Sequence, residues 1–283
     1  MKAIYKQKLP IWVNTLNKDY KLLLSDDLDS LLSALILKEL FGCEVNSFYS
    51  FSKLYKTTNP LLQEGEVVGV DLALTGDTKT FDNHVIRLGE HFTTNPNSIN
   101  CNTLFNVYAG GTQYHKKYAG STLLTILSLY NVDLSKLSDE AKRILLCIDS
   151  TFLGFYSSYQ ADRNACKFFL TEVLELDVLY ETLERTTKEE FREIQKKYNL
   201  SAKITINKDG KLKTNCNLFY ISLGLEFEIF DWIGLPKDTF QLKKTFKNAY
   251  DTILNIKNLI ADGVKIFSMA CTSKFYVSFS MEE

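Results

Sequence analysis

Short apolar segments of strand length alternate with a helical pattern in the first half of the chain, and this alternation constrains the fold most. The apolar segments are Tyr20–Leu24, Glu44–Tyr49 and Glu66–Val70. Between the first two, residues 28–41 repeat leucine and isoleucine at three- and four-residue spacing, and Gly42 follows as a C-cap. A strand–helix–strand order of this kind predicts an α/β fold with a mainly parallel sheet and flanking helices.

The pattern changes near residue 160. Charged helices are expected over Cys166–Thr182 and Lys188–Tyr198, and Lys203–Lys213 is typical of a hairpin that turns at Asp209-Gly210. A chain of 283 residues is long enough for two domains. We therefore predict an α/β domain over 1–160, a helical linker over 161–200 and a smaller α+β domain over 201–283.

Charge and composition exclude several classes of function. The 33 Lys and Arg balance 34 Asp and Glu, so there is no general electrostatic attraction for nucleic acid, and long duplex DNA is disfavoured as a substrate. No apolar run approaches the roughly 20 residues of a membrane span, and no signal-peptide pattern opens the chain. The 6 cysteines contain no CxxC pair, which favours a reduced, cytoplasmic protein without a zinc–cysteine site.

Aspartates follow the apolar runs at four places. If the runs are neighbouring parallel strands, these acids meet at the carboxyl edge of the sheet, where open α/β folds bind ligands. A single aspartate in such a place is usually a helix cap or a turn residue, but the repetition favours a shared site. The runs and their acids are Leu22–Leu24 with Asp26, Asp27 and Asp29, Val67–Val70 with Asp71, Phe81 with Asp82-Asn83-His84, and Leu145–Ile148 with Asp149.

Converging carboxylates raise one another's pKa and destabilise a fold unless a cation lies between them. Oxygen ligands with an imidazole nitrogen and no thiolate favour Mn²⁺ or Mg²⁺ over zinc or copper. The chain offers enough ligands for two ions about 3.5–4 Å apart, an arrangement that binds a phosphoryl group and activates water at neutral pH.

The same residues resemble the motifs of a known family. Asp27-Leu28-Asp29-Ser30-Leu31-Leu32-Ser33 resembles the first motif, DxDxxxS, of the DHH phosphoesterase superfamily. Asp71 resembles the lone aspartate of the second motif, and Asp82-Asn83-His84 resembles the DHH triplet. Asp149-Ser150-Thr151-Phe152 is similar to the fourth motif, so the resemblance covers about residues 18–160 in the family's order.

This resemblance implies a DHH-type domain that hydrolyses phosphodiesters with two metal ions, usually Mn²⁺, with Mg²⁺ or Co²⁺ as alternatives. The superfamily includes RecJ-like exonucleases, nano-RNases, cyclic-dinucleotide phosphodiesterases and one class of inorganic pyrophosphatase. The implied substrate is a short oligonucleotide, a single-stranded nucleic-acid end or a cyclic dinucleotide. The implied metal ligands are Asp27, Asp29, Asp71, Asp149 and Asn83, with His84 beside the scissile phosphate and Asp82 supporting it.

Two positions differ from the family pattern and keep an alternative open. The first His of the triplet is Asn83, and Leu23 stands where many members have another His. The alternative is a nucleotide-binding protein on the same fold with weakened catalysis. Inorganic pyrophosphatase is disfavoured, because Lys243-Lys244 is a poor match to the paired basic residues of that class.

Further residues are candidate substrate contacts. Arg87, three residues after His84, could contact phosphate or form a surface ion pair. His115 precedes a helix and could contact substrate or be an exposed loop residue. The lysine-rich stretches Lys196–Lys213 and Lys237–Lys257 could also contact substrate, or could be solvated surfaces.

Overall fold

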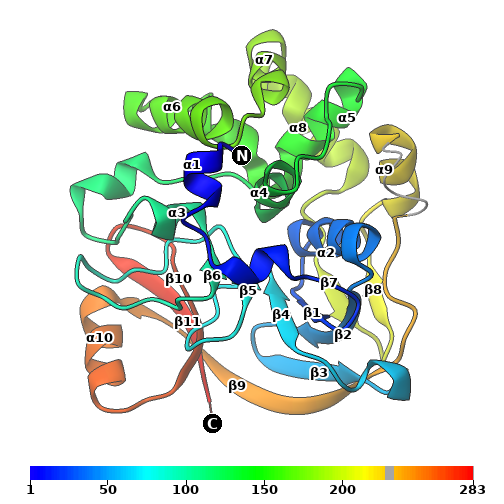
Figure 1. Cartoon of the computed structure of the whole chain (residues 1–283), viewed down its shortest axis with the longest axis vertical. Coiled ribbons are helices and arrows are strands. Elements are labelled where there is room, and N and C mark those ends of the chain that lie inside the picture. The colour runs from blue at the N-terminus through cyan, green and yellow to red at the C-terminus, as the bar shows by residue number, and fades with distance from the viewer. Residues whose placement is uncertain (227–232, 283) are drawn as a thin grey trace.

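The computed structural model describes residues 1–226 and 233–282, and Figure 1 shows a large curved sheet with a layer of helices packed above it. Nine strands of the described residues form this sheet. They are β1 Lys21–Leu24, β2 Glu44–Tyr49, β3 Lys53–Thr57, β4 Val67–Val70, β5 Thr80–Phe81, β6 Ser98–Ile99, β9 Phe240–Thr252, β10 Ile266–Cys271 and β11 Tyr276–Glu282.

The sheet is mixed, in the order β10-β11-β9-β3-β2-β1-β4-β5-β6. Strands β2, β1, β4, β5 and β6 pair in parallel. Strand β3 joins β2 in antiparallel, and β9, β11 and β10 continue in antiparallel from β3. The predicted α/β class is confirmed, but the sheet is mixed and not mainly parallel. Its parallel part lies where the first-half pattern placed it. The long strand β9 extends the same sheet from a distant part of the sequence.

The sheet curls until β10 meets the segment that follows β4. Leu74 and Ser268 form an isolated antiparallel bridge, and Thr75 donates from its backbone N–H to Phe267 O at 3.1 Å. Cys271 N donates in the same way to Val85 O at 2.8 Å. The inner face of β9–β11 therefore closes over the carboxyl edge of β1 and β4.

Helices cover the parallel part of the sheet and fill most of the space above it. None of the helices in the described ranges is both long and apolar enough to cross a bilayer. The α-helices are α1 Ala3–Lys6, α2 Leu28–Phe41, α3 Cys101–Leu104, α4 Thr122–Leu129, α5 Asp139–Cys147, α6 Gln160–Lys167, α7 Asp177–Arg185, α8 Lys188–Tyr198, α9 Leu218–Leu225 and α10 Ile253–Ala261. Short 3₁₀ segments are η1 Ile11–Asn14, η2 Pro60–Leu62, η3 Thr112–Lys116 and η4 Ile148–Gly154, and η5 Phe168–Val173 is a π-helix.

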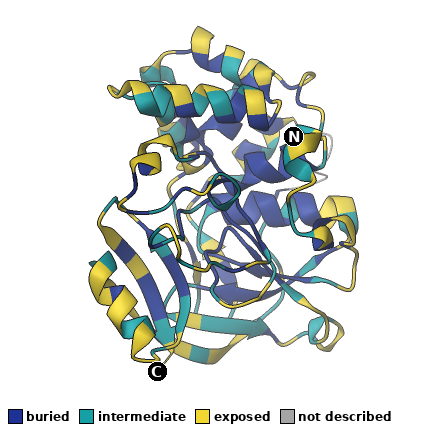
Figure 2. Ribbon diagram, turned by 60° about the vertical axis from the view of Figure 1, so that its left-hand side comes forward, coloured by how far each residue is buried: buried dark blue, intermediate teal, exposed yellow. Residues whose placement is uncertain are grey.

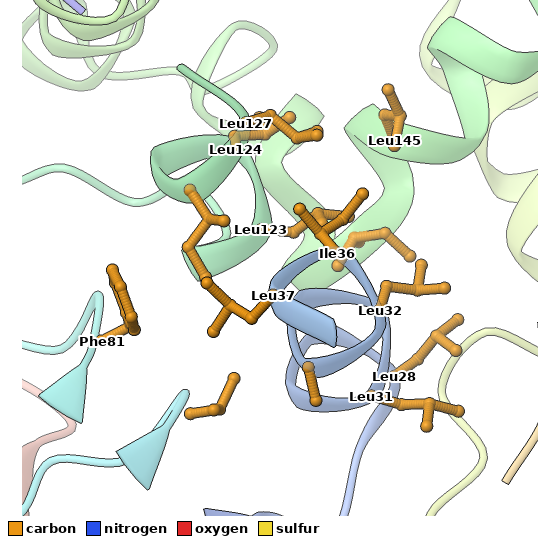
Figure 3. Close-up of a cluster of buried hydrophobic side chains, with 14 of the residues drawn as sticks. Leu28, Leu31, Leu32, Ile36, Leu37, Phe81, Leu123, Leu124, Leu127 and Leu145 are labelled. Carbon is orange, nitrogen blue, oxygen red and sulfur yellow. The ribbon is translucent and has the colours of Figure 1, made fainter. Parts of the chain in front are cut away.

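Helix α2 carries the centre of the core and has the predicted bounds. Asp27 caps its N-terminus by accepting from Ser30 N at 3.2 Å, and Gly42 ends it in the left-handed region with φ 71°. Its buried leucines and Ile36 belong to the main apolar cluster, and Figure 3 shows Ile36 next to Leu123 of α4. Figure 2 shows that burial is concentrated in these helices and the central strands, whereas the outer faces of the upper helices and α10 are exposed. Because α2 buries most of its apolar side chains, its N-terminus, which carries Asp27 and Asp29, is held in place.

Two further sequence predictions are confirmed. Lys188–Tyr198 is α8, which begins with a capping box between Thr187 and Glu190. The hairpin is β7 Ile204–Ile206 with β8 Leu212–Thr214, and Gly210 has φ 75° in its turn.

The predicted strand over Leu145–Ile148 is wrong, because this run lies in α5 and the start of η4. Ser138 caps α5 by accepting from Ala141 N at 3.2 Å, and the apolar residues that follow share one buried helical face. The expected helix over Cys166–Thr182 is interrupted: α6 continues into η5, and α7 begins after a break at Glu175, which has φ 55°.

Candidate functional site

Two candidate acids follow neighbouring parallel strands. β1 and β4 pair in register, so the segments after them leave the sheet at the same edge. Asp71 is the first residue after β4, and its φ of 55° turns the chain out of the strand. Its Oδ1 accepts a hydrogen bond from Thr122 Oγ1 at 2.7 Å. Asp27 lies opposite, at the N-terminus of α2, so the predicted convergence of these two segments is present.

Asp29 is buried and anchored to α4. Its Oδ2 accepts from Thr122 N at 2.7 Å and its Oδ1 from Leu123 N at 2.8 Å. The Ser33 hydroxyl, at the end of the DxDxxxS segment, also donates to Oδ1 at 3.4 Å. The first N–H groups of a helix lack partners within the helix, so this carboxylate satisfies two of them and ties α2 to α4.

Asp149 reaches the same place from η4 and not from a strand. It has φ 48°, and Ser150 beside it has φ 53°, so a sharp turn after α5 directs the chain. Asn83 Nδ2 donates to Asp149 Oδ2 at 2.8 Å and to Gly120 O at 2.7 Å. Because both partners can only accept, the amide nitrogen must face them. Asn83 thus holds Asp149 through its nitrogen and keeps Oδ1 as an acceptor.

His84 is held by Asp82. The Asp82 Oδ1 lies 2.7 Å from His84 Nδ1 and accepts from His84 N at 3.1 Å. Asn100 Nδ2 donates to Asp82 Oδ2 at 2.8 Å, which fixes the buried carboxylate. Burial opposes the charged imidazole, but Asp82, then Asp71 and Asp149, raise the pKa of His84 to about 10. Asp82 therefore favours the charged imidazolium form of His84.

The gathered carboxylates destabilise one another. Burial is the largest cause that raises the pKa of Asp29 and Asp71 well above its ordinary value, and the pKa of Asp149 is raised in the same way. Asp71 and Asp149 also raise the pKa of Asp29, and Asp27 raises that of all three. His84 works in the opposite direction at Asp71 and Asp149. The acids predicted from the sequence are thus within electrostatic reach of one another.

Lys203 belongs to this site and was not singled out from the sequence. Its Nζ donates to Asp26 Oδ1 at 2.9 Å and lies 3.3 Å from Asp27 Oδ2. The backbone N–H of Ile204 donates to Asp26 O, so the hairpin that carries Lys203 is attached to the loop after β1. The sequence indicated Lys203 only as one of the six lysines in the stretch Lys196–Lys213. Which of these lysines reaches the acids is decided by long-range packing.

The types of ligand atom in this site suit a hard divalent cation. Several carboxylates share one buried region with fewer cationic groups, and oxygen ligands of this type suit Mn²⁺ or Mg²⁺. In the part of the chain that the structure describes, no three His, Cys, Asp or Glu side chains are arranged closely enough to hold an ion. Hydrogen bonds occupy Asp29, Asp71 and Asp149, but Asp29 Oδ2, Asp71 Oδ1 and Asp149 Oδ2 each accept one hydrogen bond and keep a second lone pair for a cation.

A small cavity of about 110 Å³ opens in front of Asp71 and His84. Its opposite wall is the inner face of β9, β10 and β11. This wall carries four polar side chains among apolar ones. None of the four was predicted to contribute to the site, because the strand pairings that place them there join residues almost 200 positions apart. They are Asn248, Ser268, Ser278 and Ser280.

The two candidate substrate contacts lie apart from the carboxylates. Arg87 donates from Nη1 to Asn106 Oδ1 at 2.8 Å and from Nε to Phe92 O at 3.3 Å. His115 is exposed on η3 and lines a separate, larger cavity. Thr122, which contacts two of the acids, was missed; the Gly120-Ser121 break before α4 indicated only close packing.

The metal-free protein is expected to lose stability as the pH rises from about 4, the ordinary pKa of a carboxyl group, toward neutrality. Asp29, Asp71 and Asp149 have raised pKa values in the folded state, so folding is favoured below their unfolded pKa, and this contribution disappears as the pH rises through the folded pKa. Urea unfolding in EDTA across this range measures the slope. An Asp71→Asn variant should have a shallower slope, and an equal slope would contradict the assignment.

Comparison of the chain with protein-family models, with curated proteins and with solved structures found no match, so the family resemblance carried by the four motifs stays a prediction.

Proposed function

We propose that this chain is a metal-dependent phosphodiesterase on a DHH-type domain, acting on short oligonucleotides, single-stranded ends or cyclic dinucleotides. The observation that carries the proposal is the burial of Asp29, Asp71 and Asp149 within electrostatic reach of one another. Burying like charges is costly, and a divalent cation is the economical compensation. The carboxyl edge of parallel strands, where Asp71 lies, is also the usual ligand site of α/β sheets.

The residues divide into cation ligands and groups that handle the phosphate. Asp27, Asp29, Asp71, Asp149 and Asn83 Oδ1 would hold the ions. A bound divalent cation supplies charge neutralisation for the phosphate and lowers the pKa of an attacking water.

The cationic side chains then act on the substrate. The His84 imidazolium is positioned to donate to a phosphate oxygen in the cavity that it shares with Asp71, because Asp82 holds its Nδ1. Asn83 fixes the carboxylate of Asp149. Lys203 supplies a second positive charge at the edge of the site, beside Asp27.

The inner face of β9–β11 favours a nucleotide substrate over pyrophosphate. Tyr250 and Tyr276 stack with ring centroids 5.4 Å apart and an interplanar angle of 3°. They are 62% and 42% exposed. Tyr250 pairs with Ser278, and alternate residues of a strand share a face, so both rings lie on the face that bears Ser278 and Asn248. Exposed aromatic rings beside a phosphate site suit base stacking.

A nucleotide-binding protein with weakened catalysis is the second candidate. Two contacts favour it: Asn83 presents its amide nitrogen to Asp149, and the Lys203 ammonium already contacts Asp27. An ammonium bound to a ligand carboxylate competes with a metal for the same oxygen.

The experiment that separates the two is a substrate panel with the purified chain in Mn²⁺, Mg²⁺ and Co²⁺. Bis(p-nitrophenyl) phosphate, a short labelled oligonucleotide, a cyclic dinucleotide and pyrophosphate are compared. Mn²⁺-dependent diester hydrolysis without pyrophosphate hydrolysis supports the proposal. Nucleotide binding without turnover in any metal supports the binding protein.

The Tyr276→Leu variant is expected to raise the KM for a dinucleotide about tenfold, with little change in kcat. Stacking on an aromatic ring contributes roughly 1–3 kcal/mol per base, and leucine keeps the apolar bulk without the ring face. Steady-state kinetics measure the effect. Tyr220→Leu is the matched control, because Tyr220 is similarly exposed, at 58%, but lies on α9. Equal effects of the two substitutions would contradict a stacking role.

A further inference from the structure

A lysine next to the β7–β8 hairpin already brings a positive charge to the carboxylates. Lys203 Nζ donates to Asp26 Oδ1 at 2.9 Å and lies 3.3 Å from Asp27 Oδ2. Its charge also reaches Asp149. Burial raises the pKa of that carboxyl most, and His84 and Lys203 are among the causes that lower it. The ammonium therefore lies among the converging carboxylates, where the sequence predicts a metal ion.

The backbone next to Lys203 is fixed, whereas its side chain is free to move. Ile204 N donates to Asp26 O at 2.6 Å, and the Ile204 side chain is buried in the main apolar cluster. The Lys203 side chain is 55% exposed, and a lysine stem is flexible. A metal ion can therefore replace the ammonium at Asp27 without unfolding the hairpin, but it must break an existing ion pair to do so.

Both carboxylate oxygens of Asp27 are engaged. Its Oδ1 caps α2 by accepting from Ser30 N at 3.2 Å, and its Oδ2 faces the Lys203 ammonium. A metal ion bound to Asp27 would either displace the ammonium or share Oδ2 with it, and two cations at one oxygen repel each other. Loss of one charge-assisted hydrogen bond corresponds to about tenfold or more in affinity, so the Asp27 position binds a metal weakly while Lys203 is present.

Asp71 is in a different situation. It accepts a hydrogen bond from the neutral hydroxyl of Thr122 at 2.7 Å. His84 shares its cavity, but the Nδ1 of His84 lies 2.7 Å from Asp82 Oδ1. Among residues 1–226 and 233–282, no lysine or arginine forms an ion pair with Asp71, whereas Asp27 has one with Lys203. Asp71 therefore still lacks the cationic partner that Lys203 provides at Asp27.

We infer that Lys203 takes the place of one of the two divalent cations and limits the wild-type chain to a single bound ion. The inference rests on the proposed function and deepens it, because it states how many ions the carboxylates hold. Asp29, Asp71 and Asp149 would hold the remaining ion, and Asp27 holds the ammonium.

The test counts the Mn²⁺ ions that the full chain binds, from the EPR signal of free Mn²⁺ during a titration. The wild-type protein is expected to bind a single ion per chain. Lys203→Met keeps the length of the side chain and removes the charge, and it should bind a second ion at least about tenfold more tightly than the wild type does. Lys203→Arg keeps the charge and should behave as the wild type. Lys208→Met is the matched control, because Lys208 is exposed in the turn of the same hairpin and the substitution removes the same charge.

A wild-type chain that binds two Mn²⁺ ions with similar affinity overturns the inference, and so do equal Mn²⁺ counts for the wild type and Lys203→Met. A second ion gained equally by Lys208→Met overturns it as well. Hydrolysis of bis(p-nitrophenyl) phosphate, measured on the same samples, separates this result from failure of the proposed function. If Lys203→Met gains an ion but no diester is hydrolysed, the inference stands and the enzyme proposal falls. If diesters are hydrolysed and the ion counts are equal, the reverse holds.

Discussion

The Asp71→Asn variant is expected to lose about a thousandfold in Mn²⁺-dependent phosphodiester hydrolysis, while its metal-free form becomes more stable than the wild type. The loss follows because Asp71 faces the same small cavity as His84 and is one of the proposed metal ligands. Metal ions contribute several kcal/mol to such reactions, and about 4 kcal/mol corresponds to a thousandfold change in rate. Steady-state kinetics with bis(p-nitrophenyl) phosphate measure the loss.

The expected gain in stability of the metal-free protein comes from removing the buried charge of Asp71. Asp71 is 5% exposed, and burial together with Asp27 raises its pKa well above the ordinary value. Asparagine removes this charge and can still accept the hydrogen bond from Thr122 through its own Oδ1. Asparagine also tolerates the φ of 55° at this position better than most residues. We expect the unfolding midpoint in EDTA to rise by a few degrees.

Mn²⁺ provides the control for this prediction. A cation that binds only the folded state raises the unfolding midpoint of the wild-type protein, and the rise should be much smaller for Asp71→Asn. A variant that keeps both its activity and its stabilisation by Mn²⁺ would show that Asp71 is not a ligand. A metal-free variant less stable than the wild type would show that its charge is compensated by other means.

Local signals in the sequence account for the parts of the fold that were predicted correctly. The start and end of α2 follow from Asp27 and Gly42, each of which acts on its immediate neighbours. The hairpin turn likewise follows from Asp209-Gly210. The pairing of β9 with β3 depends on contacts between distant residues that no local pattern encodes. The curl that brings β10 to Leu74 could not be predicted for the same reason.

The residues of the candidate site likewise divide into those with a local signal in the sequence and those placed by tertiary packing. The acids at strand ends could be identified because parallel strands place the residues that follow them at one edge. Asp149 was included on the assumption of a strand that is a helix, and the left-handed turn at Asp149 and Ser150 brings it to the site instead. Lys203 and Thr122 reach the acids through tertiary packing and carry no local signature. The strand pattern therefore gave a wrong physical reason for the position of Asp149.

The Asp29→Ala variant is expected to destabilise the metal-free protein by roughly 3 kcal/mol, in contrast to Asp71→Asn. Asp29 is 3% exposed and accepts hydrogen bonds from Thr122 N and Leu123 N. Alanine leaves both N–H groups buried without these acceptors, and each orphaned donor costs about 1–3 kcal/mol. Urea unfolding at neutral pH in EDTA measures the change.

Two effects compete at Asp29, and their magnitudes decide the sign. Removing the carboxylate relieves repulsion with Asp71 and Asp149, which by itself would stabilise the fold. Loss of the carboxylate leaves Thr122 N and Leu123 N without their acceptors, because the side chain of the cap residue Ser121 accepts from Leu124 N instead. Asp29→Asn is the matched variant, because it keeps one acceptor oxygen and should fall between Asp29→Ala and the wild type. An Asp29→Ala variant as stable as the wild type would mean that relief of charge repulsion fully offsets the loss of the two hydrogen bonds, which would contradict a net stabilising role for Asp29.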